Sequence, residues 1–278
     1  MPHTPLVSGC ALSYEVRGAG EAVLFLQGVG VHGDGWRPQV DEFRARRRCI
    51  TVDNRGIGRS VPAGGPVTVE RMALDALAVL DAESIDVAHV VGHSLGGLVA
   101  LQLALTARNR VASLALLCTF ADGRAAAPPT PRMIWLGARS RIGTRSARRR
   151  AFLGLVLPDS ALAREDAATL ARRLEPLFGH DLADSPPIVS AQLRAMRAAN
   201  VRPRLGELAG LRCLVVSAVH DPIAPPRLGR ALASGIPGAR FVCVEDASHG
   251  LPIHRADTTN RLLEEHFRGA SPSAGPGA

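Results

Sequence analysis

The chain has 278 residues, enough for one large α/β domain or for a core with an inserted subdomain, and its hydrophobic fraction of 46% excludes general disorder. The formal net charge is +8 and every basic residue is an arginine, which excludes a Schiff-base lysine and the lysine of a phosphate-binding loop. Aromatic residues make up only 4%, too few for a base-stacking platform, so a solvated arginine surface is favoured over nucleic-acid binding.

Leader and membrane signals are missing from the sequence. No run of eighteen apolar residues occurs, and the first residues lack the charged-then-apolar layout of a signal peptide. The five cysteines show no metal-ligand spacing, and most lie in or beside apolar runs, which is typical of buried thiols in a reducing compartment. We predict a cytoplasmic protein without a metal site. A cysteine nucleophile is the alternative, although no turn motif surrounds any cysteine.

Strand and helix patterns alternate through the first half of the chain. Alternating apolar residues at 12–16 predict a half-exposed strand, and the period at 69–82 predicts an amphipathic helix. A continuous apolar run predicts a strand covered on both faces at residues 22–26, and largely apolar runs predict further strands at 49–52, 87–91 and 111–118. Strands that alternate with helices form a parallel sheet with crossover connections.

This alternation stops between residues 122 and 210, where no convincing buried strand occurs. Helical patterns at 161–174 and 188–199 predict a helical cap inserted into a core made of residues 1–121 and 211–268. The core pattern resumes with predicted strands at 213–217 and 241–244 and a helix at 253–267. Residues 269–278 contain only Ser, Pro, Gly and Ala, so this tail is predicted to be disordered.

A Gly-His-Ser-Leu-Gly stretch at residues 92–96 matches the G-x-S-x-G nucleophile elbow. An apolar strand precedes it and a helix follows it. Such a sharp turn needs small residues two before and two after the serine, because the backbones crowd there. It holds the Ser94 hydroxyl at a helix N-terminus, where the helix dipole favours developing negative charge. The alternative is a tight turn without chemistry.

A serine hydroxyl needs an adjacent base that a third group orients. Asp221 follows the predicted strand at 213–217, and His249 follows the last predicted strand. Both positions lie at the carboxyl edge of a parallel sheet, where the elbow also opens. The order Ser94, Asp221, His249 matches one known triad order. Asp122 is a rival acid, but the Pro-Ile-Ala-Pro stretch after Asp221 favours Asp221.

Five motifs in this order resemble the α/β-hydrolase-fold proteins, a group that includes 3-oxoadipate enol-lactonases and cofactor-free haloperoxidase-like esterases. The resemblance extends over about residues 12–267. It implies a doubly wound, mainly parallel sheet with an inserted helical cap, and no metal or organic cofactor. The matching stretches are Gln27-Gly28-Val29-Gly30, residues 53–60, 92–96 and 220–225, and Ser248-His249-Gly250.

The resemblance also implies roles for single residues. Ser94 is the expected nucleophile, His249 the base and Asp221 the group that stabilises the imidazolium. The backbone N–H groups of Val29 and Leu95 are the expected oxyanion hole.

One residue departs from the family pattern: Gln27 stands where most members have histidine. We interpret Gln27 as a brace for the loop, with a contact between its amide and the substrate as the alternative. Candidate pocket residues are Gln27, Gly28, Trp36, Phe120 and Trp135, and simple packing is the alternative for the three aromatic residues.

The predicted function is hydrolysis of a carboxylic ester, lactone or thioester of a small molecule through an acyl-enzyme, with no nucleic acid or membrane as partner. Acyl transfer, carbon–carbon bond cleavage, lyase or cyclase chemistry and a ligand receptor on the same scaffold are the alternatives. The arginine-rich stretch Arg139–Arg150 lies in the predicted cap. A solvated helix face is the favoured interpretation of this stretch, and recruitment of an anionic substrate or docking of an acidic carrier protein is the alternative.

Overall fold

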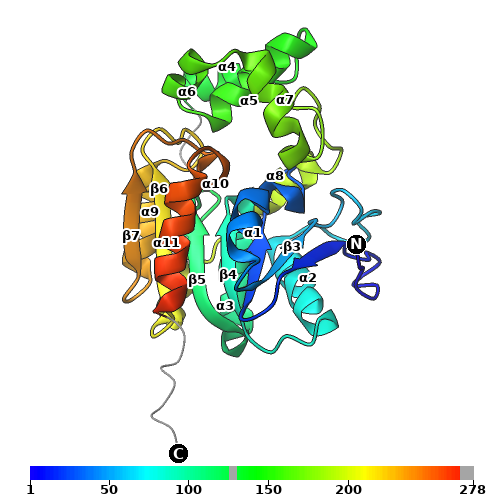
Figure 1. The fold of residues 1–278 in the computed structure, drawn as a ribbon, viewed down its shortest axis with the longest axis vertical. Coiled ribbons are helices and arrows are strands. Elements are labelled where there is room, and N and C mark those ends of the chain that lie inside the picture. Colours follow the sequence, from blue (N-terminus) through cyan, green and yellow to red (C-terminus); the bar gives the residue numbers. More distant parts are fainter. Residues whose placement is uncertain (125–129, 270–278) are drawn as a thin grey trace, which may run out of the picture.

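A seven-stranded sheet forms the centre of the molecule in the computed structural model, which describes residues 1–124 and 130–269 (Figure 1). The strand order is β1-β3-β2-β4-β5-β6-β7, and only the β1–β3 pair is antiparallel. This confirms the predicted doubly wound, mainly parallel sheet. The strands are β1 (Tyr14–Arg17), β2 (Ala22–Leu26), β3 (Arg48–Val52), β4 (Ala88–His93), β5 (Val111–Leu117), β6 (Cys213–Ala218) and β7 (Arg240–Val244).

Side chains of the central strands alternate between two apolar cores. Leu24 and Val90 belong to the core on one face of the sheet, whereas Val23 and Val91 belong to the core on the other face. Successive residues of a strand point to opposite faces, so a strand covered on both sides is apolar at most positions. The largely apolar runs in the sequence, in which His89 of β4 and Ser113 of β5 are buried polar exceptions, follow from this arrangement.

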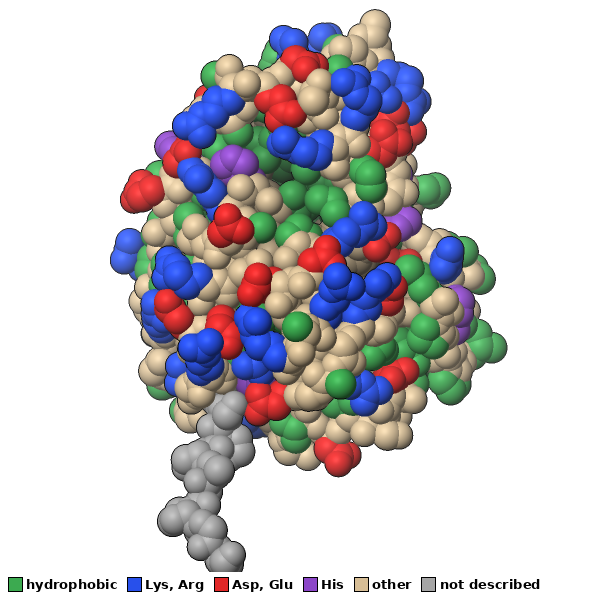
Figure 2. Space-filling view, viewed as in Figure 1, with side chains coloured by type: hydrophobic (Ala, Val, Ile, Leu, Met, Phe, Trp, Pro, Cys, Tyr) green, Lys and Arg blue, Asp and Glu red, His purple; other side chains and the backbone are tan. Residues whose placement is uncertain are grey.

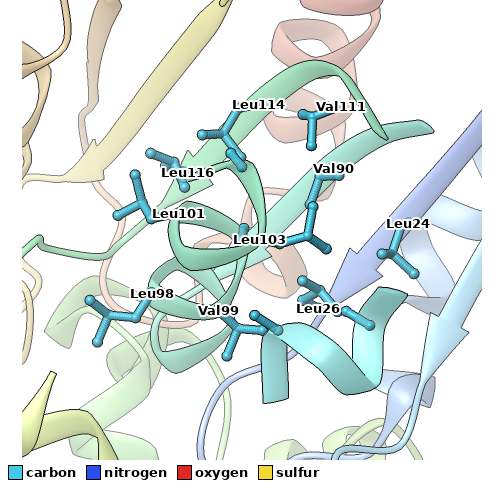
Figure 3. Packing of buried hydrophobic residues seen from close by; sticks show 14 of the residues in the cluster. Leu24, Leu26, Val90, Leu98, Val99, Leu101, Leu103, Val111, Leu114 and Leu116 are labelled. Atoms are coloured by element: carbon cyan, nitrogen blue, oxygen red, sulfur yellow. The ribbon is translucent and has the colours of Figure 1, made fainter. Parts of the chain in front are cut away.

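Helices cover both faces of the sheet. The first core is closed by α2 (Val69–Ala82), α3 (Leu95–Thr106) and α9 (Pro226–Gly235), and the second by α1 (Arg37–Phe43), α10 (Leu251–His254) and α11 (Ala256–Arg268). Helix α3 is apolar nearly all round because neighbours surround it. Figure 3 shows its leucines among those of β2 and β5. Short 3₁₀ turns lie at η1 (Gly33–Trp36), η2 (Arg108–Arg110) and η3 (Arg202–Leu208).

In the described part of the segment between β5 and β6, five α-helices stand above the carboxyl edge of the sheet (Figure 1). They are α4 (Pro131–Arg139), α5 (Arg145–Val156), α6 (Asp159–Arg164), α7 (Ala167–Phe178) and α8 (Val189–Ala198), and we call them the cap. The single helix predicted at 161–174 is two helices, because the Asp166 carboxylate accepts hydrogen bonds from two backbone N–H groups at the start of α7.

None of the helices in the described ranges is both long enough and apolar enough to cross a membrane. The predicted disorder of the tail concerns residues 269–278, of which only Gly269 lies within the described residues. Its carbonyl accepts a hydrogen bond from Arg212, at 2.8 Å.

Candidate active site

Ser94 stands at a strained turn between β4 and α3. Its φ of +54° is uncommon for a residue with a side chain. A Cβ atom at Gly92 would lie 2.3 Å from the Gly96 carbonyl oxygen, and one at Gly96 would lie 2.1 Å from the Leu26 carbonyl oxygen. Neither position tolerates a side chain, so the two glycines allow the turn for the reason that the sequence predicts.

Three side chains from separate loops form one chain of hydrogen bonds. His249 follows β7, and its Nε2 lies 3.0 Å from the Ser94 Oγ. Its Nδ1 lies 2.8 Å from Oδ2 of Asp221, which follows β6. All three residues are buried. When Nδ1 carries the ring proton, Nε2 is free to accept the serine proton.

Asp221 lies in an environment that keeps it ionised. Its Oδ1 accepts hydrogen bonds from the backbone N–H groups of Ile223 and Ala224, each at 2.8 Å. Burial by itself would raise the pKa of Asp221, but the neighbouring His249 and these hydrogen bonds outweigh burial and lower the pKa below its ordinary value. The carboxylate of Asp122, the rival acid, accepts a hydrogen bond from the Arg124 N–H at 2.9 Å, whereas the Nδ1 of His249 is bonded to Asp221.

His93 and Cys118 are buried beside His249. The His93 Nε2 donates to the His249 carbonyl at 2.8 Å, and burial together with the adjacent His249 lowers the pKa of His93 to about 3. Burial raises the pKa of the Cys118 thiol well above its ordinary value, so this cysteine stays protonated and is not a nucleophile at neutral pH. His93 therefore supports the backbone of His249 as a neutral donor.

A metal ion in the cluster of His93, Cys118 and His249 would have to displace hydrogen bonds that His249 already makes. His93, Cys118 and His249 have potential ligand atoms within 4.8 Å of one another. Both ring nitrogens of His249 are already in hydrogen bonds with Ser94 and Asp221, and Nε2 of His93 is bonded to a carbonyl. The geometry favours a proton-transfer chain over a metal centre.

The loop after β2 lies against the serine. A Cβ atom at Gly28 would be 3.2 Å from the Ser94 Cβ. The Gln27 Oε1 accepts the Gly28 N–H at 2.9 Å, which is the bracing contact that the sequence suggests. Leu95 is the first residue of α3, so no carbonyl of this helix lies one turn before it to accept a hydrogen bond from its N–H. The N–H of Val29 likewise makes no hydrogen bond within the described residues.

A cavity of about 440 Å³ separates this site from the cap. Figure 2 shows hydrophobic side chains where the surface is hollowed below the cap. Ser94, His249, Gln27 and Gly28 line its floor, and a volume of this size suits a small molecule. Much of the remaining wall is apolar and comes from the cap: Phe152, Leu155, Phe178, Leu182, Leu193 and Met196.

Residues 21–256 match the family model that describes the alpha/beta hydrolase fold. The chain belongs to the α/β-hydrolase family. A putative carbamate hydrolase RutD from Azorhizobium caulinodans is 33% identical over 91% of this chain and 93% of that protein. A putative non-heme bromoperoxidase BpoC from Mycobacterium tuberculosis is 30% identical over 92% of this chain and 97% of that protein.

A solved structure gives the same result. The enol-lactonase from Burkholderia xenovorans LB400 is 28% identical to this α/β-hydrolase, with a TM-score of 0.79 over 96% of this chain and 100% of that chain. Together with the family match, these similarities make the protein a hydrolase of the α/β fold.

Three aromatic residues that the sequence offers as pocket candidates are not among those that line the cavity of this hydrolase. Trp36 is fully buried against Phe25, with ring centroids 5.2 Å apart, and Phe120 belongs to the apolar core on one face of the sheet. Trp135 is 61% exposed on α4. Sequence reasoning missed the cap residues Phe152 and Phe178. In the sequence, both stand at apolar positions of amphipathic helices. Such a position does not show whether the side chain lines a cavity or packs in a core.

The arginine-rich stretch is partly engaged inside the cap. Arg145 contacts Asp181 at 2.6 Å and Asp184 at 2.9 Å, and Arg149 also pairs with Asp181. These ion pairs join α5 to the segment after α7. Arg145 and Arg149 therefore have partners of their own, and docking of an acidic carrier protein stays a prediction.

Proposed function

We propose that this hydrolase cleaves a carboxylic ester, lactone or thioester of a small molecule, with Ser94 as the nucleophile. The observation that carries this proposal is the continuous chain from the Ser94 Oγ to His249 at 3.0 Å and from His249 to Asp221 at 2.8 Å. A non-catalytic binding protein has no need of a serine at strained φ aligned with a base.

The chemistry follows from these contacts. His249 Nε2 takes the proton of the Ser94 Oγ as the oxygen attacks the carbonyl carbon, and Asp221 stabilises the imidazolium. The carbonyl oxygen becomes an oxyanion that accepts hydrogen bonds from the N–H groups of Val29 and Leu95. The bond to the leaving alkoxide or thiolate breaks, and His249 returns the proton to that group. Water then attacks the acyl-enzyme by the same route and regenerates Ser94.

The wall of the cavity indicates the kind of substrate. Apolar cap side chains such as Phe152 and Leu155 surround the space beside Ser94, so an apolar acyl or alcohol group is the part that binds there. Similarity to an enol-lactonase supports lactones among the substrates, and similarity to a putative carbamate hydrolase adds carbamates to the compounds that must be tested.

The decisive test is active-site labelling together with turnover. Wild type, Ser94→Ala and the exposed cap variant Ser146→Ala are treated with a fluorophosphonate probe and assayed on p-nitrophenyl esters, lactones and aryl carbamates. We expect labelling of wild type and Ser146→Ala at Ser94, and neither labelling nor hydrolysis with Ser94→Ala. A wild-type protein that neither labels nor hydrolyses any of these compounds contradicts the proposal and favours a ligand receptor or non-hydrolytic chemistry.

A further inference from the structure

The cap contacts the proposed oxyanion loop through polar side chains. The Gly30 N–H donates to Oε1 of Gln192 at 2.9 Å, and Gln192 is a fully buried residue of α8. The Gly30 carbonyl lies 3.0 Å from Nε2 of His180, which follows α7. Both polar groups of the Gly30 backbone are therefore bonded to side chains of the cap.

The core holds the other end of the same loop. Gln27 Oε1 accepts from the Gly28 N–H, and Asn54 Nδ2 donates to the Gln27 carbonyl at 3.0 Å. Val29 lies between these two anchored ends. Because each peptide unit is planar, fixing the units on both sides restricts the direction of the Val29 N–H.

We propose that Gln192 is a positioning residue, which fixes Gly30 so that the Val29 N–H points at the substrate oxygen during the reaction. His180 is the second brace. The cap thereby completes the oxyanion hole in addition to enclosing the substrate. This inference rests on the proposed function, since it concerns the donor that stabilises the oxyanion.

The packing around Gln192 supports this role. Gly30 has a φ of +75°, and a Cβ atom there would lie 3.0 Å from Cγ2 of Val189, so α8 is packed closely on the loop. The Nε2 of Gln192 is buried and has no hydrogen-bond partner among the described residues. A buried amide whose nitrogen has neither of its two N–H donors paired is a poor choice for stability alone. Its oxygen, by contrast, has a defined partner in the loop.

This unpaired donor makes a clean test available. Gln192→Met keeps the length of the side chain and removes both the oxygen and the nitrogen of the amide. It leaves the Gly30 N–H unpaired but also removes the unpaired Nε2 with its two N–H donors, so the number of unpaired buried donors does not rise. We expect the melting temperature to stay close to that of wild type. The loop that contains Gly30, however, is no longer held in its wild-type geometry by α8.

The experiment compares wild type, Gln192→Met, Gln192→Glu and the matched control Arg194→Gln, an exposed position on the same helix. Each is assayed for kcat and KM on p-nitrophenyl butyrate and for inhibition by phenylboronic acid, whose tetrahedral adduct with Ser94 places an oxygen in the oxyanion hole. Loss of a whole oxyanion donor lowers kcat by roughly 100- to 1000-fold. Gln192→Met misplaces the donor without removing it. We therefore expect it to lower kcat about tenfold, a smaller reduction than the loss of a whole donor causes.

The accompanying measurements separate positioning from general damage. For Gln192→Met we expect KM within about twofold of wild type and boronate affinity reduced by the same factor as kcat. Gln192→Glu keeps an acceptor oxygen, because a buried carboxyl group is held protonated, and it should recover most of the rate. Arg194→Gln should match wild type throughout.

Three results would overturn the inference. If Gln192→Met keeps the wild-type kcat and boronate affinity, the loop needs no brace from the cap, and the proposed function stands. If kcat falls only in step with a large drop in melting temperature, Gln192 is merely structural. If wild type itself neither hydrolyses the ester nor binds the boronate, the proposed function fails, and this inference with it.

Discussion

The sheet edge and the cap are stabilised in different ways. At the sheet edge, Ser94, Asp221 and His249 are buried at the ends of apolar strands whose backbones the sheet holds in place. In the cap, a smaller apolar cluster is supplemented by arginine–aspartate pairs at the surface, and Trp135 is exposed to solvent. The hydrogen-bonded chain of Ser94, His249 and Asp221 therefore lies at the sheet edge, and much of the apolar wall of the cavity lies on the cap.

The separation is not complete, because the cap contacts two of the loops that form the site. Gln192 binds Gly30 in the loop after β2, and the Gly250 N–H, next to His249, donates to the Val156 carbonyl of α5 at 2.7 Å. A Cβ atom at Gly250 would lie 2.7 Å from this same oxygen. Changes in the cap can therefore reach the reacting atoms as well as the substrate.

The largest effect is expected at the sheet edge, from Asp221→Asn. The variant keeps the shape of the side chain but favours the wrong tautomer of His249, so kcat on p-nitrophenyl esters should fall by about 10⁴-fold. Asp122→Asn is the control and should leave kcat near wild type, because the two ring nitrogens of His249 are bonded to Asp221 and Ser94, whereas the Asp122 carboxylate accepts from the Arg124 N–H. A larger loss with Asp122→Asn than with Asp221→Asn would reverse the assignment of the acid.

Next comes the buried ion pair of the core. Arg55 is fully buried, and its Nε and Nη2 each lie 2.6 Å from a carboxylate oxygen of Asp75. Arg55→Leu leaves Asp75 as an unpaired buried charge, so the free energy of unfolding in urea should fall by about 3–5 kcal/mol. Arg59→Leu, at an exposed position in the same loop, should change it little. Equal stability of the two variants would show that Asp75 finds another partner.

A buried histidine of the core sets a pH dependence. Burial and the charge of Arg212 lower the pKa of His266 to about 3, whereas an unfolded histidine titrates near 6.5. Between these values the unfolded chain binds a proton that the folded chain does not, so stability falls as the pH falls, by about 1.4 kcal/mol per pH unit. His266→Leu should make urea stability less dependent on pH between 6 and 4. An unchanged slope would contradict this account.

The smallest effect is expected in the cap. A hydrogen bond from Arg149 holds the pKa of Asp181 below its ordinary value, so Asp181 contributes stability above the unfolded pKa of about 3.9 and loses it as the pH falls. Asp181→Asn should lower the free energy of unfolding at pH 7 by less than about 1 kcal/mol, because Arg145 and Arg149 are exposed enough for solvent to screen the pairs. The difference should shrink on acidification and in high salt. A decrease in the free energy of unfolding as large as that of Arg55→Leu would mean that the ion pairs of the cap contribute as much stability as the buried pair of the core.

Local patterns were sufficient for most of the core. Apolar runs located the central strands, and the glycines around Ser94 predicted a crowded turn that Gly92 and Gly96 show directly. The positions of Asp221 and His249 after successive strands predicted that they share one edge with Ser94, where hydrogen bonds now join them. These features follow from the period of a strand, the size of a glycine and the common direction of parallel strands.

Patterns were weaker in the cap. The segment at 161–174 has one helical period but contains a break at Asp166, whose capping role depends on two backbone N–H groups. Of the pocket candidates, Trp36 is fully buried, whereas Trp135 is largely exposed to solvent. Residue type indicates that an aromatic ring has apolar area to cover, but not which neighbour covers it.

The sequence by itself determined the sheet, the elbow and the order of the three residues that meet at its edge, because each depends on near neighbours or on the regular geometry of parallel strands. Only the tertiary structure decided which side chains enclose the cavity and that Gln192 bonds to Gly30, 162 residues away along the chain. Such a contact depends on where α8 settles on the core. No periodicity in the sequence encodes it, because packing between distant segments is a property of the whole fold.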